Sequence, residues 1–481
     1  MSTESLALIW GVIVIAADIV LRIVALIIVP RNRRPQTALA WLLAIFFIPF
    51  VGIVLFLIAG SAKLSRSRRR KQSEVDAMIA GSTEGYDLPA VREGWPSHFA
   101  RVATLNRALG AMPLAGGNTA DLIPDDADAL AQMTAAIRSA NQYVHCEFYI
   151  MALDDTTTDF FDALVEARSR GVIVRVLVDH LGSRRYKGHK QGLRLLTEAG
   201  IEWHHMLPFR PLRGKLQRPD LRNHRKLLVI DGALGFSGSR NIIDPSYGRK
   251  DDLRWKDLMA RFEGPVVAGL NAIFLTDWYT ETDQIISRDT DALRTEHGGA
   301  DCQVVPSGPG FEEENNLRMF NALVYAAERQ IILTSPYFVP DDSMLYAITT
   351  AAKSGLDVQL FVGEVGDQFL VYHAQRSYYA ALLKAGVRIW LYDGPTILHA
   401  KHMTFDDELA VIGSSNLDMR SFTLDLELSV MVRSEEFVAQ LRDVQQAYRE
   451  NSRELLVDEW DGRSPLVKAL DNLARLTAAV Q

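Results

Sequence analysis

Residues 223–241 read NHRKLLVIDGALGFSGSRN, and residues 399–416, HAKHMTFDDELAVIGSSN, repeat their pattern. Both stretches fit the string H-x-K-x4-D-x6-G-S-x-N, with the same six residue types at the same spacings. The apolar residues inside each copy predict a strand. Because strand side chains alternate between faces, the His and the Lys of each copy are expected to point the same way. Each copy thus offers an imidazole beside an ammonium group.

This pair of side chains suits a phosphate ester. His224 and His399 can supply a nitrogen nucleophile and a proton donor near neutral pH, while Lys226 and Lys401 supply positive charge. Further donors for the phosphate oxygens are expected from the last part of each motif, at Ser239, Asn241, Ser414 and Asn416. The residue types predict phosphoryl chemistry at a site built from both copies.

Carboxylates occur at two kinds of position around the motifs. Asp257 and Glu427 stand at equivalent positions after the first and second copy, and we expect them to fix the tautomers of the two histidines. Asp231 and Asp406 complete the catalytic strings, but their places at strand ends favour a polar brace over a chemical role. Because lysines and hydrogen-bond donors can stabilise the charge, neither a metal nor another cofactor is predicted.

The paired string resembles the phospholipase D superfamily, whose two half-sites meet in one active centre. Over nearly its whole length the chain resembles bacterial cardiolipin synthases, on stretches such as LRNHRK at 221–226, SPYFVPD at 335–341 and NLDMRSF at 416–422. The resemblance implies transfer of a phosphatidyl group between two phosphatidylglycerols through a phosphohistidine, with His224 as nucleophile. The chain departs from the family at Asp425, where Asn is common, and at Leu258-Met259, where Thr-His is common.

Three other functions compete with this interpretation. A hydrolytic phospholipase D would use the same residues with water as the acceptor. A nuclease would favour a basic surface, and a scaffold that binds phospholipids without catalysis would tolerate the loss of one motif. Both motifs are intact, and residues 72–481 carry a net charge of −7 − 8 = −15, because residues 1–71 hold ten Lys and Arg against two acids. Phospholipids and a membrane are therefore the expected partners, and nucleic acid is not.

Helical and apolar segments alternate twice along the chain, in the same order. In the first half, helices are expected at 127–140, 158–170 and 192–199, and strands at 143–151, 172–179 and 201–206. In the second half, helices are expected at 316–328, 343–354 and 377–385, and strands at 331–339, 358–362 and 387–392. This duplication predicts two phospholipase-D-like α/β domains, 126–298 and 299–481, packed about a pseudo-twofold axis, with 62–125 as linker and lead-in.

Two apolar segments precede these domains. Residues 6–29 and 38–59 are each long enough to span a bilayer, which predicts a transmembrane hairpin over residues 1–61. Pro49 and Gly52 are expected to bend the second span, and Asp18 and Arg22 to form an ion pair on one face of the first.

The basic residues around these segments predict an orientation. The turn between the spans holds three arginines, and residues 63–71 hold six Lys and Arg. The larger count favours a multi-pass protein of the cell membrane with its N-terminus and catalytic part both in the cytoplasm. The run at 63–71 suits either a topology signal or contact with anionic headgroups.

Overall fold

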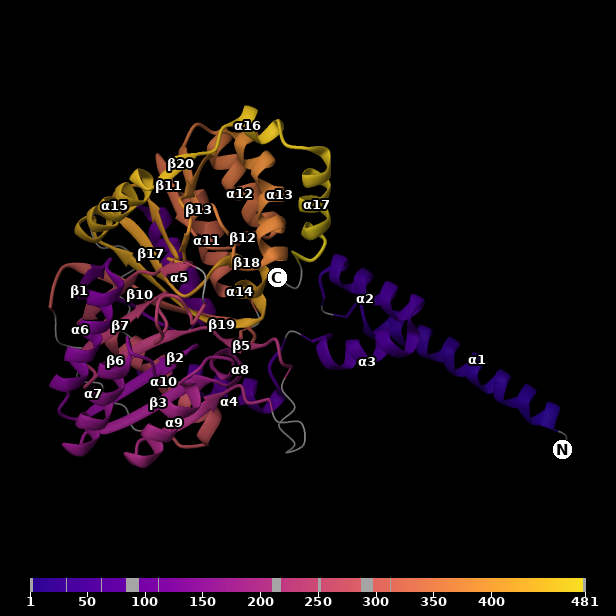
Figure 1. The fold of residues 1–481 in the computed structure, drawn as a ribbon, viewed down its shortest axis with the longest axis horizontal. Coiled ribbons are helices and arrows are strands. Elements are labelled where there is room, and N and C mark those ends of the chain that lie inside the picture. The colour runs from indigo at the N-terminus through magenta and orange to yellow at the C-terminus, as the bar shows by residue number, and fades with distance from the viewer. Residues whose placement is uncertain are drawn as a thin grey trace. The chain divides into compact units, whose positions relative to one another are not determined.

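The computed structural model describes residues 3–31, 33–61, 63–83, 95–110, 112–209, 218–249, 252–286, 297–311 and 313–478. The chain forms two compact units, Met1–Lys63 and Leu64–Gln481 (Figure 1). We call them the membrane unit and the catalytic unit, and each is described by itself.

The membrane unit contains three apolar helices, α1 (Thr3–Ile28), α2 (Pro35–Phe47) and α3 (Pro49–Ala59). Within the described residues, only the stretch Ile9–Ile28 of α1 is long and apolar enough to cross a membrane. The predicted second span is divided at Ile48, immediately before Pro49, where proline cannot continue the hydrogen bonding of a helix. Asp18 and Arg22 form the predicted ion pair, with 2.7 Å between Arg22 Nε and Asp18 Oδ2.

Helices α2 and α3 fold back on each other. A Cβ at Gly52 would lie 2.5 Å from the carbonyl oxygen of Ala44, so glycine permits the close approach of the two helices. Trp41 packs on Phe56 with ring centroids 5.5 Å apart. At the open end of the pair, Arg33 Nε donates to the carbonyl of Gly60, and Arg33 Nη1 donates to that of Val29. The end of α3 therefore returns to the end of α1.

One continuous sheet runs through the catalytic unit and carries the duplication. The first half contributes seven strands in the order β4-β3-β2-β6-β7-β9-β1, and the second half contributes their counterparts in the order β10-β19-β17-β16-β11-β13-β14. The antiparallel pair β1–β10 joins the halves at the centre, as a pseudo-twofold requires. The strands of the first half are β1 (Leu114–Ile123), β2 (Tyr143–Phe148), β3 (Ile173–Asp179), β4 (Glu202–Met206), β6 (Lys226–Ile230), β7 (Leu234–Gly238) and β9 (Met259–Glu263).

The second half has the same strand pattern with one addition at its edge. Its strands are β10 (Ala300–Ser307), β11 (Gln330–Thr334), β13 (Asp357–Gly363), β14 (Arg388–Tyr392), β16 (His402–Phe405), β17 (Leu409–Gly413), β19 (Asp425–Arg433) and the extra β20 (Ser452–Glu454). Short strands outside this path pair as β12 (Phe338–Val339) with β18 (Leu417–Asp418), β15 (Thr396–Leu398) with β8 (Arg254–Lys256), and β5 (Arg222–Asn223) with β19.

Helices cover this sheet and bury two large apolar cores, one in each half. The six predicted helices are all present as α6, α7, α9, α11, α12 and α13, although α13 begins eight residues earlier than expected, and the remaining helices were not predicted. In the first half they are α6 (Asp126–Ser139), α7 (Thr158–Ser169), α8 (His180–Arg184), α9 (His189–Glu198) and α10 (Val266–Thr282). In the second half they are α11 (Asn315–Ala326), α12 (Asp342–Lys353), α13 (Phe369–Ala385), α14 (Met419–Thr423), α15 (Glu435–Glu450), α16 (Val457–Asp461) and α17 (Pro465–Arg475).

Residues 62–125, expected as linker and lead-in, contain α4 (Arg66–Ser82), α5 (Ser97–Gly110) and the central strand β1. Part of the basic run lies on α4 and binds the end of α10. Arg68 forms two hydrogen bonds with Glu281, at 2.6 and 2.7 Å, and Lys71 Nζ lies 2.6 Å from Asp283 Oδ1. These two cations therefore hold α4 against the first half.

Candidate active site

The backbone at each motif histidine pairs with the opposite half of the catalytic unit. Strand β5, just before His224, pairs in parallel with the start of β19 from the second half. Strand β15, just before His399, pairs in parallel with β8 from the first half. The backbone N–H of His224 donates to Leu426 O, and that of His399 donates to Lys256 O, each at 2.8 Å. The backbone that carries each imidazole is thus hydrogen-bonded to the opposite half.

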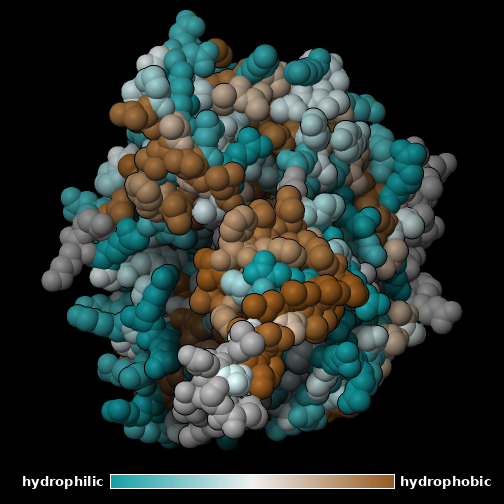
Figure 2. Space-filling model, turned by 90° about the vertical axis from the view of Figure 1, so that its right-hand side faces the viewer, coloured by the Kyte–Doolittle hydropathy of each residue, from teal (hydrophilic) through white to brown (hydrophobic). Residues whose placement is uncertain are grey.

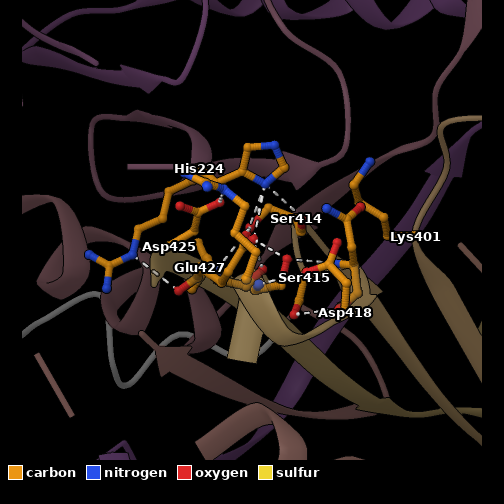
Figure 3. A network of polar contacts seen from close by, with 12 residues as sticks. His224, Lys401, Ser414, Ser415, Asp418, Asp425 and Glu427 are labelled. Atoms are coloured by element: carbon orange, nitrogen blue, oxygen red, sulfur yellow. Dashed lines mark hydrogen bonds and ion pairs between the residues drawn. The ribbon is translucent and has the colours of Figure 1, made fainter. Parts of the chain in front are cut away.

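The orienting carboxylates complete this crossed arrangement. His399 Nδ1 lies 2.6 Å from Asp257 Oδ1, and His224 Nδ1 lies 3.0 Å from Glu427 Oε1 (Figure 3). His224 Nδ1 also lies 3.1 Å from the carbonyl oxygen of Ser414, which can only accept, so Nδ1 carries the proton. This tautomer leaves Nε2 of His224 with a free lone pair. Asp257 and Glu427 therefore each serve the histidine of the other motif.

Lys226 and Lys401 are buried beside the two imidazoles. Lys226 Nζ donates to the carbonyl of His224 at 2.5 Å, and Lys401 Nζ donates to that of His399 at 2.6 Å. Burial lowers the pKa of Lys226 to about 7 and that of Lys401 to about 8, although the charges of nearby carboxylates raise both pKa values in part. A bound anion would restore the ammonium forms, so this part of the site is prepared for negative charge.

The motif serines lie differently from the expectation. Ser239 Oγ donates to Asp257 Oδ1 at 2.6 Å, and Ser414 Oγ donates to Glu427 Oε2 (Figure 3). In turn they accept the backbone N–H groups of Leu258 and Leu428, at 2.9 and 3.0 Å. Their hydroxyl hydrogens are committed to the orienting carboxylates, so in this structure they position those groups and do not face a phosphate.

The two motif asparagines are also buried, in different surroundings. Asn241 accepts the backbone N–H of Ile150 at 3.1 Å and donates to Tyr247 Oη at 2.8 Å. Asn416 Oδ1 is buried and has no hydrogen-bond partner among the described residues. Asn241 thus ties its motif to the segment that follows β2, whereas Asn416 keeps an acceptor oxygen available for a donor.

Asp231 and Asp406 lie at the far ends of β6 and β16 from the histidines. Asp231 accepts the backbone N–H groups of residues 141–143, and Asp406 accepts those of residues 328–330, all between 2.8 and 3.0 Å. Both adopt positive φ, 52° and 53°, in the turns that follow their strands. These carboxylates brace the start of β2 and of β11 and do not reach the imidazoles.

The electrostatics of the two histidines differ. Burial and the charges of Lys226 and Lys401 lower the pKa of both. For His399 the carboxylate of Asp257 opposes this effect. Burial alone would raise the pKa of Asp257, but the contacts with His399 and the charge of Lys401 hold it below its ordinary value. Asp257 is therefore ionised at neutral pH.

Glu427 behaves in the opposite way. Burial, only partly offset by the charge of Lys226 and the hydrogen bond from Ser414, raises its pKa to about 7. A second hydroxyl, that of Ser421, donates to Glu427 Oε1 at 2.8 Å. Two further acids lie close by, and burial raises the pKa of Asp425 to about 8 and that of Asp418 to about 6. His224 thus has a partner that titrates near neutrality.

Several site residues were missed in the sequence. The Tyr149 ring lies 4.9 Å from that of His224 and beneath the ammonium of Lys226, and the Tyr247 ring lies 6.5 Å from that of His399. Tyr337 Oη donates to Asp367 Oδ1 at 2.9 Å. Tyr149 follows β2 and Tyr337 follows β11, the equivalent strand of the second half. This repeated tyrosine was the signal in the sequence that could have placed them near the site.

Comparison with known families gives two matches. A family described as "Cardiolipin synthase, PLD-like domain" matches residues 133–278 and 321–448, so each half carries one match. A second family, described as "Phospholipase_D-nuclease N-terminal", matches residues 20–61. The two matches together follow the division into a membrane unit and a duplicated catalytic unit.

Curated relatives match over nearly the whole chain. Cardiolipin synthase A of Proteus mirabilis is 33% identical over 453 residues, covering 92% of this chain and 92% of the relative. Cardiolipin synthase A of Pectobacterium carotovorum is 34% identical over 472 residues, covering 95% and 94%. Among solved structures, phosphatidylserine synthase of Haemophilus influenzae superimposes with a TM-score of 0.60 at 14% identity, over 79% of this chain and all of that one. This last likeness concerns the fold.

Proposed function

Because this chain belongs to the cardiolipin synthase family of the phospholipase D superfamily, we propose that it joins two phosphatidylglycerols into cardiolipin and releases glycerol. That the chain is a phosphatidyltransferase which makes cardiolipin follows from the family. The choice of phosphatidylglycerol as both donor and acceptor, and the roles of individual residues, are the proposal. The observation that carries it is the pair of crossed His–carboxylate contacts beside two buried lysines.

In the first step, Nε2 of His224 attacks the phosphorus of the donor lipid. A bond forms between this nitrogen and phosphorus, and the bond from phosphorus to the glycerol oxygen breaks. His399, in its imidazolium form, gives its proton to the departing glycerol oxygen. Burial and the charge of Lys401 lower the pKa of His399, and the ionised Asp257 opposes this shift; Asp257 supports the assignment because an ionised partner stabilises an imidazolium. The low pKa of His224 keeps that ring neutral and nucleophilic.

In the second step, neutral His399 removes the proton from a hydroxyl of the acceptor phosphatidylglycerol. The resulting oxygen attacks phosphorus, the bond from phosphorus to His224 breaks, and cardiolipin is formed. Lys226 and Lys401 stabilise the charge on the non-bridging oxygens throughout, and Asn416 can donate to one of them. One phosphodiester is exchanged for another, so the reaction is nearly neutral in energy and we propose that it needs no nucleotide and no metal.

The reaction is tested with the purified full chain in vesicles that contain labelled phosphatidylglycerol, with and without phosphatidylethanolamine. We expect cardiolipin and glycerol in equal amounts, unaffected by exhaustive chelation of divalent ions. Phosphatidic acid as the main product would identify a hydrolase instead. Activity that is lost on chelation and restored by one divalent ion would contradict the mechanism.

A pH dependence follows from Glu427. This carboxylate receives hydrogen bonds from His224, Ser414 and Ser421, and all three are strongest when it is ionised. Its folded-state pKa is raised to about 7, so the active form is lost as the pH falls through about 7. We expect kcat/KM for a short-chain substrate to rise with an apparent pKa near 7. A profile that stays flat from pH 5 to pH 8 would contradict this role.

A single substitution connects that rise to Glu427. The hydroxyl of Ser421 lowers the pKa of Glu427, so Ser421→Ala should move the rise to higher pH. Thr423→Val on the same short helix is the control, because the hydroxyl of Thr423 bonds the carbonyl of Met419. An unchanged profile in Ser421→Ala, or an equal shift in both variants, would assign the rise to another group.

The protein is membrane-associated, and for the membrane unit we propose a topology with one span. Helix α2 has 13 residues, about 20 Å in length, which is short of a hydrocarbon core of about 30 Å. Since α3 returns to Gly60 beside Arg33, the pair α2–α3 enters the membrane and leaves on the same side. All the arginines at 31–34 and the run at 63–71 then lie in the cytoplasm with the catalytic unit, as the charge rule favours.

This proposal differs from the two-span expectation in where it places the N-terminus. With a single span, Ser5 should lie on the outer side of the cell membrane, whereas Ser61 should lie inside. Single cysteines at these positions, in a chain lacking the native cysteines, can be tested with a thiol reagent that does not cross membranes. We expect labelling of intact cells at position 5 only. Protection at position 5 until the cells are opened would restore the two-span hairpin.

A further inference from the structure

The C-terminal helix α17 buries a carboxylate and exposes leucines, which is the reverse of the usual arrangement in a surface helix. Its buried residues are Asp471, 1% exposed, and Ala474, 3% exposed. Its leucines face outward, with exposed fractions of 83% for Leu466, 63% for Leu473 and 80% for Leu476. A helix in contact with water normally buries its apolar stripe and exposes its carboxylates. The outer side of α17 therefore suits an apolar neighbour.

Ionic contacts fix α17 in this orientation on α13. Asp471 Oδ1 lies 2.7 Å from His373 Nδ1 and 3.4 Å from Arg376 Nε, and Arg463 pairs with its other oxygen. Arg475 lies over the ring of Tyr378, 4.5 Å from the centroid. Rotating α17 so that its leucines became buried would separate the buried carboxylate of Asp471 from Arg376 and Arg463, and this would cost free energy of folding.

The apolar surface continues from α17 to the first turn of α13. Phe369 and Leu370 are 65% and 51% exposed, and the Phe369 ring lies 4.5 Å from that of His373, the partner of Asp471. Figure 2 shows the apolar surface of the whole chain from the right-hand side of Figure 1, the membrane helices included, so the apolar residues of α17 and α13 are identified here by their exposed fractions. We call the surface that these residues form the apolar patch; it consists of Phe369, Leu370, Leu466, Leu470, Leu473 and Leu476.

The patch borders the approach to the proposed site. The segment just before Phe369, residues 363–368, lines a small pocket together with Tyr337 and Ile397. Ile397 lies two residues before His399, and the charge of Asp367 in this segment raises the pKa of Lys401. The Phe369 end of the patch thus directly follows a segment that lies within electrostatic range of Lys401.

We propose that the apolar patch is a lipid-docking surface, which seats the catalytic unit on the bilayer that supplies its substrates. A bilayer is favoured over a second copy because the patch adjoins the segment that ends near Lys401 of a site that takes lipids, and because the protein is membrane-associated. The proposal rests on the membrane association of the protein, and it does not depend on which lipids react.

The test places an environment-sensitive dye on single cysteines in the full chain. Cys146 and Cys302 are fully buried, so labelling is directed to an introduced thiol. Leu473→Cys and Phe369→Cys report on the patch, and Ile173→Cys is the control, because Ile173 begins β3 whereas the site lies beyond the other end of that strand. Each labelled protein is reconstituted into vesicles of phosphatidylethanolamine and phosphatidylglycerol, with or without nitroxide-bearing acyl chains.

For the two patch positions we expect blue-shifted emission and strong quenching by the nitroxide lipids, with neither effect at position 173. An absence of quenching at positions 473 and 369 overturns the proposal. If the nitroxide lipids do not quench the dye, but labels on two protein molecules lie close to each other, the patch is an interface with a second copy. This readout needs no turnover, so its failure is distinguishable from a failure of the proposed reaction.

Activity provides a second readout with a matched pair of variants. Leu473→Glu places a charge in the patch, and Ile173→Glu places one at the control position. We expect Leu473→Glu to lower cardiolipin formation in vesicles by roughly tenfold while leaving cleavage of a short-chain, water-soluble diester unchanged. Ile173→Glu should change neither rate. An equal loss on both substrates in Leu473→Glu would indicate damage to the fold and contradict a docking role.

Discussion

His224→Ala and His399→Ala should each abolish cardiolipin formation, with losses of roughly 10⁴-fold or more. Both imidazoles stand at one centre, where the charge of His399 contributes to the low pKa of His224. One must form the bond to phosphorus and the other must deliver and collect the proton, so neither can substitute for the other. His204→Ala, on the partly exposed strand β4, is the control and should retain activity. A fully active His224→Ala or His399→Ala variant would refute the shared site.

An activated donor separates the two roles. A phosphatidyl ester of p-nitrophenol has a leaving group that departs without receiving a proton. His399→Ala should therefore still release a burst of p-nitrophenol and accumulate a phosphatidyl adduct on His224, because the acceptor is no longer deprotonated. His224→Ala should show no burst. An adduct trapped on His399 in the His224→Ala variant would reverse the assignment.

Asp257→Asn and Glu427→Gln should each lower cardiolipin formation by roughly 10³- to 10⁴-fold, because an amide partner cannot stabilise an imidazolium or hold the required tautomer. The crossed contacts predict which half-reaction each variant damages. With the activated donor, Asp257→Asn should keep most of the burst, since its partner His399 is not needed there. Glu427→Gln should lose the burst, since its partner is the proposed nucleophile.

An uncrossed arrangement predicts the opposite result for the same two variants. If Asp257 served the histidine of its own half, Asp257→Asn would remove the burst and Glu427→Gln would preserve it. Thermal unfolding of both variants provides the control for folding, because each carboxylate is fully buried and hydrogen-bonded. A normal unfolding temperature together with a lost burst assigns the effect to the chemistry.

The duplicated motif and the alternation of elements allowed much of the fold to be predicted from the sequence. The doubled string predicted a shared site, and the repeated order of helices and strands predicted two α/β halves, because periodicity follows directly from burial. The second span was predicted as one segment because hydropathy does not register the fold-back that Gly52 permits. A bend at Pro49 and Gly52 was expected, but the full reversal between α2 and α3 involves contacts between residues such as Trp41 and Phe56, which composition does not reveal.

At the site, the residue types were easier to predict than their partners. Asp257 and Glu427 could be proposed from their spacing, but their exchange between halves follows from the parallel pairs β5–β19 and β15–β8. Of these strands, β5, β8 and β15 have only two or three residues and give no periodic signal. The same limit applies to Ser239 and Ser414, whose hydroxyls appeared available for a phosphate until their bonds to the carboxylates were known.

The exchange of carboxylates between the halves has an evolutionary consequence. A symmetric dimer of one half would contain two identical His–carboxylate pairs, and any mutation would alter both at once. Joining the halves in one polypeptide, through the β1–β10 pair, lets each copy mutate separately. The Asp beside His399 and the Glu beside His224 are such a divergence, one methylene apart. Within one polypeptide the two imidazoles can therefore acquire different proton affinities, as the proposed division of roles requires.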